Sequence, residues 1–506
     1  MQKGILIVSR DNFYLHDILK IEGISSDCSE RLDDSIDDYD LIIISNVKFT
    51  ENNIVYFKRA CKRRKKFIVI NPDEKIRKVL DIGNAKKDDF VIWKKFNSTK
   101  LAVLNFDFLK RTYMFNEGKD ATPDKNGVFR ASSTTVVKGN EKLIPQADIL
   151  RRKLVEVIEE CLDYPLPRIW YLPNKKLAGV IFSHDSDEVS DSEFYRINEL
   201  NKKNSVNSTT FMLIKTGSRE CWQSYSRDKH DLQLHQAYFY LPNSPERLRG
   251  LSARLSSNFF SMKFQKQTLK IEKKILEELS GKKIVGIRNH GLFWHNKDDI
   301  PVWMHKSGIK FDSTLGAVYD YGYLHGTGMP FFLRMPKDFK RLDVLEFPLH
   351  IMDYVYLQHG EKTIQLTHKF LDNAIKYNSI ITFDFHHKFL RGKILDYYLD
   401  TINYAKKKGL LIESMSYFND FWRKRYNTDI MGIRFEKNRL SYNCSSEKLA
   451  EIDGLSHIVP MKFRNKKLKR ILCEGKQIKF EKIGANSAYA VFESSGNGKV
   501  IGVGYG

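Results

Sequence analysis

An apolar run that ends in two carboxylates decides the fold of this chain: Ala178-Gly179-Val180-Ile181-Phe182 leads into His184-Asp185-Ser186-Asp187. The run predicts a buried strand. Folds of the α/β class carry their sites at the carboxyl ends of strands, so both carboxylates are expected at that edge. Two residues apart on an extended backbone, they point the same way, and one can bind a metal while the other faces its water. The alternative is a capping turn, because Asp and Ser favour helix starts and loops.

Length and composition indicate a globular protein of two or three domains, since 506 residues exceed what one core holds. No stretch approaches the roughly 20 apolar residues of a membrane helix. The first residues turn polar too soon for a signal peptide, so a cytoplasmic protein is expected. The 6 cysteines form no C-x-x-C pair, which argues against a disulfide framework and against a thiolate zinc site. Any metal site must therefore use His and carboxylate ligands.

The net charge of +22 favours anionic partners. These include nucleic acid, an anionic membrane surface with peripheral contact, and an acidic or diphosphate-linked glycan. Basic clusters at 58–66 and 464–470 carry part of this charge, with a solvated helix face and a turn as the alternative reading. No recognisable nucleic-acid module accompanies them, and no nucleic-acid partner is expected.

The chain divides into three predicted parts. Residues 1–150 alternate apolar runs (4–8, 41–45, 67–71, 91–93) with amphipathic stretches, which predicts a flavodoxin-like parallel α/β domain. No Gly-rich phosphate loop follows the first run, so no nucleotide or other cofactor site is expected there. Residues 151–424 are again α/β, with strands at 178–182, 208–214, 284–288, 343–347 and 380–385 and a helix at 264–278 stopped by Gly281. Residues 425–506 show short alternating runs and glycines, typical of a small all-β module.

Three further predicted strands end in histidine. His235 ends an apolar alternation at 231–235, His290 closes the run at 284–290, and His386 closes the run at 380–386. Metal-assisted hydrolysis needs two or three protein ligands, a carboxylate that accepts a proton from water, and an acid for the leaving group. Each histidine alone is explained by a structural role. Together, at strand ends that follow the Asp-x-Asp turn, they indicate a metal site.

From about residue 165 to 424 the chain resembles the polysaccharide deacetylases, of the NodB-homology or carbohydrate esterase family 4 type, in the branch whose first motif is His-Asp-x-Asp. The matching words stand in the family's order: His184-Asp185-Ser186-Asp187, Leu234-His235, Arg288-Asn289-His290, Phe311-Asp312-Ser313-Thr314-Leu315-Gly316, Gly326-Thr327-Gly328-Met329-Pro330-Phe331, Leu345-Glu346-Phe347-Pro348 and Phe385-His386. The resemblance implies a distorted (β/α) barrel holding one divalent ion, usually zinc.

The resemblance also implies roles. Asp185 would be the general base, Asp187 and His235 metal ligands, and His386 the acid that protonates the leaving amine or alkoxide. Arg288 would orient the catalytic carboxylate. The family's second ligand histidine stands four residues after the first, where this chain has Phe239. His290 is expected to serve as the third ligand instead, with His295 a lesser candidate read as a loop histidine.

The resulting hypothesis is a metal-dependent N- or O-deacetylase acting on an acetylated or lipid-linked sugar in bacterial surface-glycan synthesis or modification. One alternative is a non-catalytic glycan-binding protein on a decayed deacetylase barrel. Another is a glycosyltransferase that uses Asp185-Ser186-Asp187 to hold a sugar nucleotide through a cation, and a minor one is a hydrolase of small non-sugar amides. An aromatic set could stack on sugars or belong to the core: Trp303, Tyr319, Tyr321, Tyr323, Phe331 and Phe332.

Overall fold

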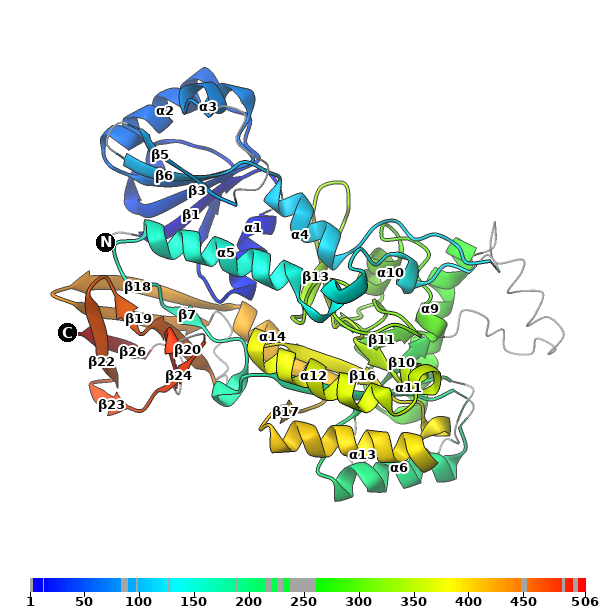
Figure 1. Ribbon diagram of the computed structural model, residues 1–506. Helices are drawn as coiled ribbons and strands as arrows, with labels where there is room; N and C mark the ends of the chain where they lie inside the picture. Colours follow the sequence, from blue (N-terminus) through cyan, green and yellow to red (C-terminus); the bar gives the residue numbers. More distant parts are fainter. Residues whose placement is uncertain are drawn as a thin grey trace.

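The computed structural model describes residues 3–11, 13–82, 90–96, 99–125, 128–187, 189–214, 231–236, 261–446, 453–484, 487–494 and 499–506, together with 216, 218, 220, 221, 223 and 224. Three bodies of β-structure follow one another along the chain (Figure 1). They are an N-terminal parallel α/β sheet, a strongly curled mixed central sheet and C-terminal antiparallel sheets. Within the described ranges, no helix combines the length and the apolar character needed to cross a bilayer.

The N-terminal sheet follows the predicted alternation of strands and helices. In spatial order its strands are β2 (Asp27–Ser29), β1 (Lys3–Ser9), β3 (Tyr39–Ser45), β4 (Lys66–Ile70), β6 (Thr99–Leu104) and β5 (Ile92–Phe96). All neighbouring pairs are parallel except the edge pair β5–β6. The short strand β2 and the strand β6 were not predicted, whereas the four apolar runs all form strands.

Helices on both faces of this sheet explain why its strands are apolar throughout. Ile43 of β3 packs in the cluster that includes α1 (Tyr14–Ile21) and α5 (Gln146–Cys161). Its neighbours Ile42 and Ile44 pack on the other face, with α2 (Glu51–Lys62). The remaining helices of this part are α3 (Glu74–Val79) and α4 (Phe108–Asn116).

The central sheet carries the residues that the sequence singled out. Its order is β13 (Phe331–Arg334), β14 (Arg341–Glu346), β12 (Phe311–Asp312), β11 (Gly286–Asn289), β10 (Asp231–Gln236), β9 (Thr209–Met212), β8 (Gly179–Asp185), β16 (Ile380–Asp384) and β15 (Ile351–Met352), with β17 (Leu411–Ile412) also paired to β8. Only β13 runs antiparallel to its neighbour among these described strands. No described pairing joins the end strands β13 and β15, so the curled sheet is a half-barrel and not a closed barrel.

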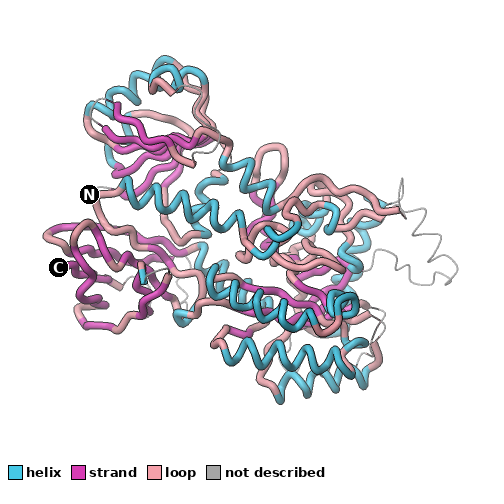
Figure 2. The backbone as a smooth tube through the Cα atoms, in the orientation of Figure 1, coloured by secondary structure: helices cyan, strands magenta, loops and turns pink. Residues whose placement is uncertain are grey.

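Helices flank the central strands (Figure 2). They are α6 (Asp191–Lys203), α9 (Ser261–Ser280), α10 (Ile300–Lys306), α11 (Asp353–His359), α12 (Lys362–Tyr377), α13 (Gly392–Lys407) and α14 (Met415–Tyr426). The predicted helix at 264–278 is α9, and Gly281 follows it with φ +70°, a left-handed conformation that suits glycine. Because the strands are parallel, their carboxyl ends share one edge of the sheet.

The C-terminal region is antiparallel, as predicted. One sheet contains β18 (Thr428–Glu436), β19 (Arg439–Ser446), β26 (Val500–Tyr505), β22 (Lys466–Cys473), β21 (Lys462–Phe463) and β23 (Lys476–Ile478). The other contains β24 (Glu481–Ile483), β25 (Tyr489–Glu493), β20 (Ser456–Pro460) and β7 (Arg168–Ile169). β23 and β24 lie close in sequence but belong to different sheets, and β7 reaches the second sheet from the bridge of residues 165–173 that precedes β8.

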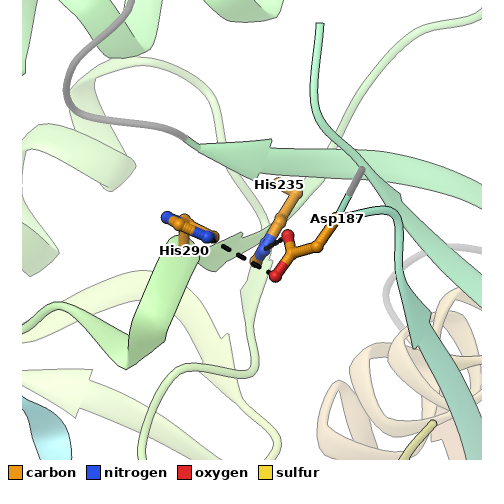
Figure 3. A group of neighbouring side chains, drawn as sticks. All are labelled: Asp187, His235 and His290. Carbon is orange, nitrogen blue, oxygen red and sulfur yellow. Dashed lines mark ion pairs between the residues drawn. The ribbon is translucent and has the colours of Figure 1, made fainter. Parts of the chain in front are cut away.

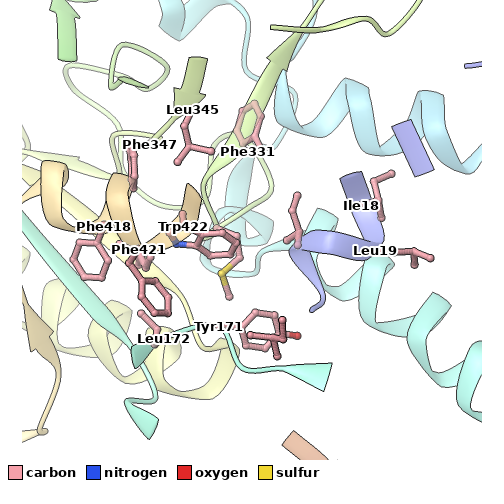
Figure 4. Close-up of a cluster of buried hydrophobic side chains, with 14 of the residues drawn as sticks. Ile18, Leu19, Tyr171, Leu172, Phe331, Leu345, Phe347, Phe418, Phe421 and Trp422 are labelled. Atoms are coloured by element: carbon pink, nitrogen blue, oxygen red, sulfur yellow. The ribbon is translucent and has the colours of Figure 1, made fainter. Parts of the chain in front are cut away.

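One hydrophobic core joins these parts (Figure 4). Ile18 and Leu19 of α1 lie in the same cluster as Phe331 of β13 and Trp422 of α14. The three-domain division after residues 150 and 424 stays a prediction, and buried contacts cross both positions.

Candidate metal centre and active site

The turn after β8 places the two aspartates. Asp185 is the last residue of β8, so the predicted strand at 178–182 is longer than expected, and Asp187 lies two residues on. Ser186 between them fixes the turn: its backbone N–H donates to the Phe211 carbonyl (3.1 Å), and its Oγ accepts from the Leu213 N–H (2.8 Å). Both bonds tie the turn to β9 and its continuation, which directs the carboxylates along the sheet edge toward β10.

Asp187, His235 and His290 converge (Figure 3). Each offers a ligand atom, and these atoms all lie within 4.8 Å of one another. His235 Nε2 is 3.3 Å from Asp187 Oδ1, and His290 Nε2 is 3.5 Å from Asp187 Oδ2. Two ligands each about 2.1 Å from a tetrahedral ion stand roughly 3.4 Å apart. The observed separations therefore fit ligands around one cation.

The state of the donors also fits a metal. His235 Nδ1 lies 3.0 Å from the Arg288 carbonyl and donates its proton there, which leaves the Nε2 lone pair facing Asp187. Asp187 Oδ1 is buried and has no donor in hydrogen-bond geometry among the described residues. The His290 side chain is 42% exposed, so the group is open on one side. An open coordination position is what a catalytic ion needs.

The surroundings of the group stabilise positive charge. Burial opposes the charged form of His235, but the carboxylates of Asp185 and Asp187 outweigh it and raise the pKa of the imidazole. Burial likewise opposes ionisation of Asp187, but His235 and His290 at its two oxygens hold its pKa well below the usual range. A divalent cation would be stabilised by the same two carboxylates.

A second acidic group is organised by an arginine. Asp185, Asp384 and His386 also offer ligand atoms within 4.8 Å of one another. Arg288 Nη1, however, donates to Asp185 Oδ1 (2.9 Å) and to Asp384 Oδ1 (2.8 Å). Its Nε and Nη2 donate to the backbone carbonyl and the Oγ of Ser313, both at 2.9 Å. The guanidinium thus takes the place of a cation, and this group is an ion-pair network.

The network sets the charge of its two carboxylates. Burial raises the pKa of Asp185, yet His235 and Arg288 more than offset it and lower that pKa below its ordinary value. Burial, with the nearby Asp185 charge, raises the pKa of Asp384 to about 7. Asp185 is therefore ionised near neutral pH and free to accept a proton on its other oxygen.

His386 is held by a carboxylate at the start of α11. Its Nδ1 donates to Asp353 Oδ1 (3.0 Å) and its backbone N–H to Asp353 Oδ2 (2.6 Å). The Nε2 then faces the ligand group, 3.6 Å from Asp187 Oδ2. Burial alone would lower the pKa of His386, but Asp353 and Asp384 raise it to about 10. The residue carries a proton at neutral pH and presents it toward the ligand group.

The structure brings all six predicted site residues together: Asp185, Asp187, His235, Arg288, His290 and His386. Their chemical roles stay predictions. Phe239 lies outside the described residues, and His295 packs against Phe129 (ring centroids 4.8 Å apart) and not in the ligand group.

Two residues of the site, Asp353 and Asp384, were not predicted. The spacing Asp384-x-His386 was a usable signal, since alternate residues of an extended segment point the same way. The sequence around Asp353 contained no comparable signal, only a carboxylate at a helix start.

Comparison with known proteins gives matches among solved structures only. No family model matches the chain, and no curated protein matches it. A Mycobacterium smegmatis protein assigned as a polysaccharide deacetylase is 15% identical, over 53% of this chain and 98% of that one, with a TM-score of 0.37. The carbohydrate deacetylase Agd3 is 7% identical, over 100% of this chain and 99% of that one, with a TM-score of 0.36.

A third match is a mutant of BA3943, a carbohydrate esterase family 4 pseudoenzyme with restored enzymatic activity. It is 13% identical, over 49% of this chain and 69% of that one, with a TM-score of 0.28. The solved structures that match this chain include many polysaccharide deacetylases of carbohydrate esterase family 4, at low sequence identity.

Proposed function

We propose that this chain is a metal-dependent hydrolase that removes acetyl groups from an acetylated sugar or polysaccharide. One observation carries the proposal: three groups with metal-ligand spacing, Asp187, His235 and His290, lie beside a carboxylate held by Arg288, Asp185, and a histidine held by Asp353, His386. Hydrolysis of an amide or ester needs these parts together, because proton removal from water and proton delivery to the leaving group occur at one acyl carbon.

Asp187, His235 and His290 would hold the ion, and the two histidines with one carboxylate match the ligands that zinc prefers. A bound divalent ion would supply Lewis acidity toward the acyl carbonyl and the attacking water. The residues of this chain supply the proton transfers. Asp185, fixed through one oxygen by Arg288 (2.9 Å), uses the other oxygen to take a proton from the water as the water attacks the acyl carbon.

His386, whose Nε2 lies 3.6 Å from Asp187 Oδ2, completes the reaction. Its Nε2 gives a proton to the sugar nitrogen or oxygen as the bond to the acyl carbon breaks, and acetate leaves. Asp353 on Nδ1 keeps the imidazole in the orientation that points Nε2 inward (3.0 Å). The released sugar gains the proton that His386 loses.

We further infer a bacterial surface glycan as the substrate, free or lipid-linked, because a net charge of +22 favours an acidic or diphosphate-bearing partner at an anionic membrane surface. We also assign the curled sheet to the distorted (β/α) barrel class. The N-terminal sheet is assigned to the flavodoxin-like class, since its parallel strands follow the order 2-1-3-4-5 with β6 as the fifth.

The decisive experiment measures metal content and acetate release over a panel of N- and O-acetylated sugars, for the wild type and Asp185→Asn. The variant should keep its zinc and lose about 10²- to 10⁴-fold in rate, the usual contribution of a general base. Asp396→Asn, an exposed carboxylate on α13, is the matched control and should behave as the wild type.

Equal acetate release by the wild type and Asp185→Asn would remove Asp185 as the base. Glycan binding without metal or acetate release would support the non-catalytic alternative, and Mn²⁺-dependent binding of a UDP-sugar would support a glycosyltransferase.

A further inference from the structure

An open cavity of about 470 Å³ lies at the junction of the three parts of the molecule. Residues of α1 line it from the N-terminal part, and Lys340 and Arg341, at the start of β14, line it from the central part. The end of α14 and the start of β18 complete the wall. Asp187, His235 and His290 do not line this cavity, so it is separate from the ligand group.

The Arg341 side chain is fixed in place at the wall of this cavity. Its guanidinium carbon lies 5.1 Å from the centroid of the Phe332 ring and 4.9 Å from that of the Tyr426 ring. Its Nη1 donates to Asp17 Oδ1 at 3.3 Å and to the Tyr426 hydroxyl. The side chain is nevertheless 43% exposed, and its Nε and Nη2 form no hydrogen bond with the described part of the chain. One edge of the guanidinium is therefore free, and it is preorganised to donate two parallel hydrogen bonds.

Positive charge exceeds negative charge around the cavity. Six charged side chains line it or contact its Asp17, with four cations, Lys20, Arg334, Lys340 and Arg341, against two carboxylates, Asp17 and Asp429. Asp17 contacts both arginines, and Asp429 Oδ1 accepts from Lys20 Nζ at 2.5 Å. The ammonium group of Lys340 has no partner among the residues that the structure describes. The excess is thus two positive charges.

The neighbouring titratable groups do not remove this excess. Burial, then the charge of Lys20, lowers the pKa of His16 in the cavity wall to about 4, so this histidine is neutral at pH 7. Burial raises the pKa of Glu117, whose Oε1 accepts the Arg334 N–H, well above its ordinary value, so its carboxyl group is neutral as well. Burial also raises the pKa of Asp17 to about 7, and a proton on Asp17 enlarges the excess.

We infer that this cavity binds a small phosphate-bearing molecule, with the phosphate group held by the free edge of Arg341 and by Lys340. A phosphate monoester carries about two negative charges near pH 7, which matches the excess, whereas a carboxylate carries one. The planar edge of an arginine fits two phosphate oxygens, and a lysine adds a point charge. Asp429 and the exposed Asn427 are available to hydroxyl groups on the rest of the ligand. Because the wall comes from three parts of the chain, the bound molecule stabilises their junction.

The test measures binding by calorimetry, with inorganic phosphate, glucose 6-phosphate and glucose as probes. Both phosphates should bind and glucose should not. Arg341→Lys keeps the charge but loses the edge with two donors, and it should weaken phosphate binding about 10-fold or more. Lys340→Gln removes an exposed side chain without a partner, so the fold is kept and binding should weaken about 3- to 5-fold. Lys337→Gln, exposed in the β13–β14 connection and outside the cavity wall, is the matched control and should bind as the wild type does.

A phosphate can also bind a metal ion, so Asp187→Asn is measured in parallel and should bind both phosphates as the wild type does. Amide hydrogen exchange locates the site without a substitution in it, and saturating glucose 6-phosphate should slow exchange in α1 and at the start of β14. Binding that is lost in Asp187→Asn but unchanged in Arg341→Lys and Lys340→Gln places the phosphate at the ligand group and overturns the inference. It is also overturned if neither phosphate binds, or if glucose binds as tightly as glucose 6-phosphate. No acetylated sugar enters these measurements, so this site and the proposed function can fail separately.

Discussion

Asp353 is the residue on which the orientation of His386 depends. Its two oxygens accept two different donors, the Nδ1–H and the backbone N–H of His386. An asparagine has only one acceptor oxygen. In Asp353→Asn, either the backbone N–H loses its partner, or the amide N–H faces Nδ1 and keeps the imidazole neutral, so that Nε2 carries a much less acidic proton. We expect acetate release to fall about 10²- to 10⁴-fold with metal content unchanged, because no ligand is removed.

The chain offers a matched control for this substitution. Asp400 also accepts a hydrogen bond from a histidine, His368 Nε2, at 2.6 Å. Its side chain is 41% exposed, and it is not one of the site residues. Asp400→Asn should leave acetate release and zinc content at wild-type levels. Full activity of Asp353→Asn would mean that His386 is not the acid that protonates the leaving group, whether or not the variant binds metal.

At the scale of elements, β12 and β14 place two carboxyl groups against each other in the interior. Asp312 and Glu346 are register partners, and both are 0% exposed. Burial, then the charge of Asp312, raises the pKa of Glu346 well above its ordinary value, and burial raises the pKa of Asp312 to about 6. The Leu315 N–H donates to Glu346 Oε1 at 3.0 Å. The pair therefore keeps a proton that the unfolded chain releases.

The consequence is a pH-dependent stability with a definite sign. As pH rises above the unfolded pKa of Glu, about 4.3, the unfolded chain loses a proton that the folded chain retains, so stability falls until the folded pKa is reached. Glu346→Gln mimics the protonated form, keeping an acceptor for Leu315 and a donor for Asp312. Its melting temperature should match the wild type near pH 4 and exceed it near pH 8, on the order of 1–3 °C.

Asp343, on the same strand as Glu346, should show the opposite pH dependence of stability. Burial opposes its ionisation, but Lys310 and Arg423 lower its pKa, so its stabilising effect appears above the unfolded pKa and is lost as pH falls. Asp343→Asn should therefore lower the melting temperature near neutral pH. A Glu346→Gln variant less stable than the wild type at pH 8 would show that the buried pair is ionised.

The length of each strand determined whether the strand and its site residues could be predicted from the sequence. The strands that contain Asp185 and His235, and the strand that ends two residues before His386, have four or more apolar or alternating residues, which is enough for a pattern. β12 and β15 have 2 residues each and show no periodicity, so neither the Asp312–Glu346 pair nor the position of Asp353 could be predicted. The pairing of β7 with β20 joins segments almost 300 residues apart, and no local signal specifies such a contact.

At the scale of the whole molecule, one buried arginine ties the three parts together. Arg425, near the end of α14 and 1% exposed, donates through Nη1 and Nη2 to the carbonyls of Lys20 and Ile21 in the last turn of α1 (both 3.0 Å). Through Nη2 and Nε it donates to the carbonyls of Ile169 (2.9 Å) and Trp170 (2.7 Å), in and after β7. The guanidinium thus caps a helix of the N-terminal part and holds the bridge that pairs with the C-terminal sheet.

Arg425→Leu should therefore weaken the connection between the parts more than it weakens any one of them. The substitution leaves four buried carbonyls without this donor, at a cost of roughly 1–3 kcal/mol for each that stays unsatisfied. Amide hydrogen exchange in β1 and β3 should accelerate, and calorimetry should show an N-terminal transition below the main one. Arg434→Leu on β18, an exposed position, is the control and should unfold as the wild type does. A single transition at the wild-type temperature in Arg425→Leu would mean that other contacts couple the parts without the arginine, among them the apolar cluster around Trp422 and the network in which Asp17 of α1 contacts Tyr426 of α14 and Arg341 of β14.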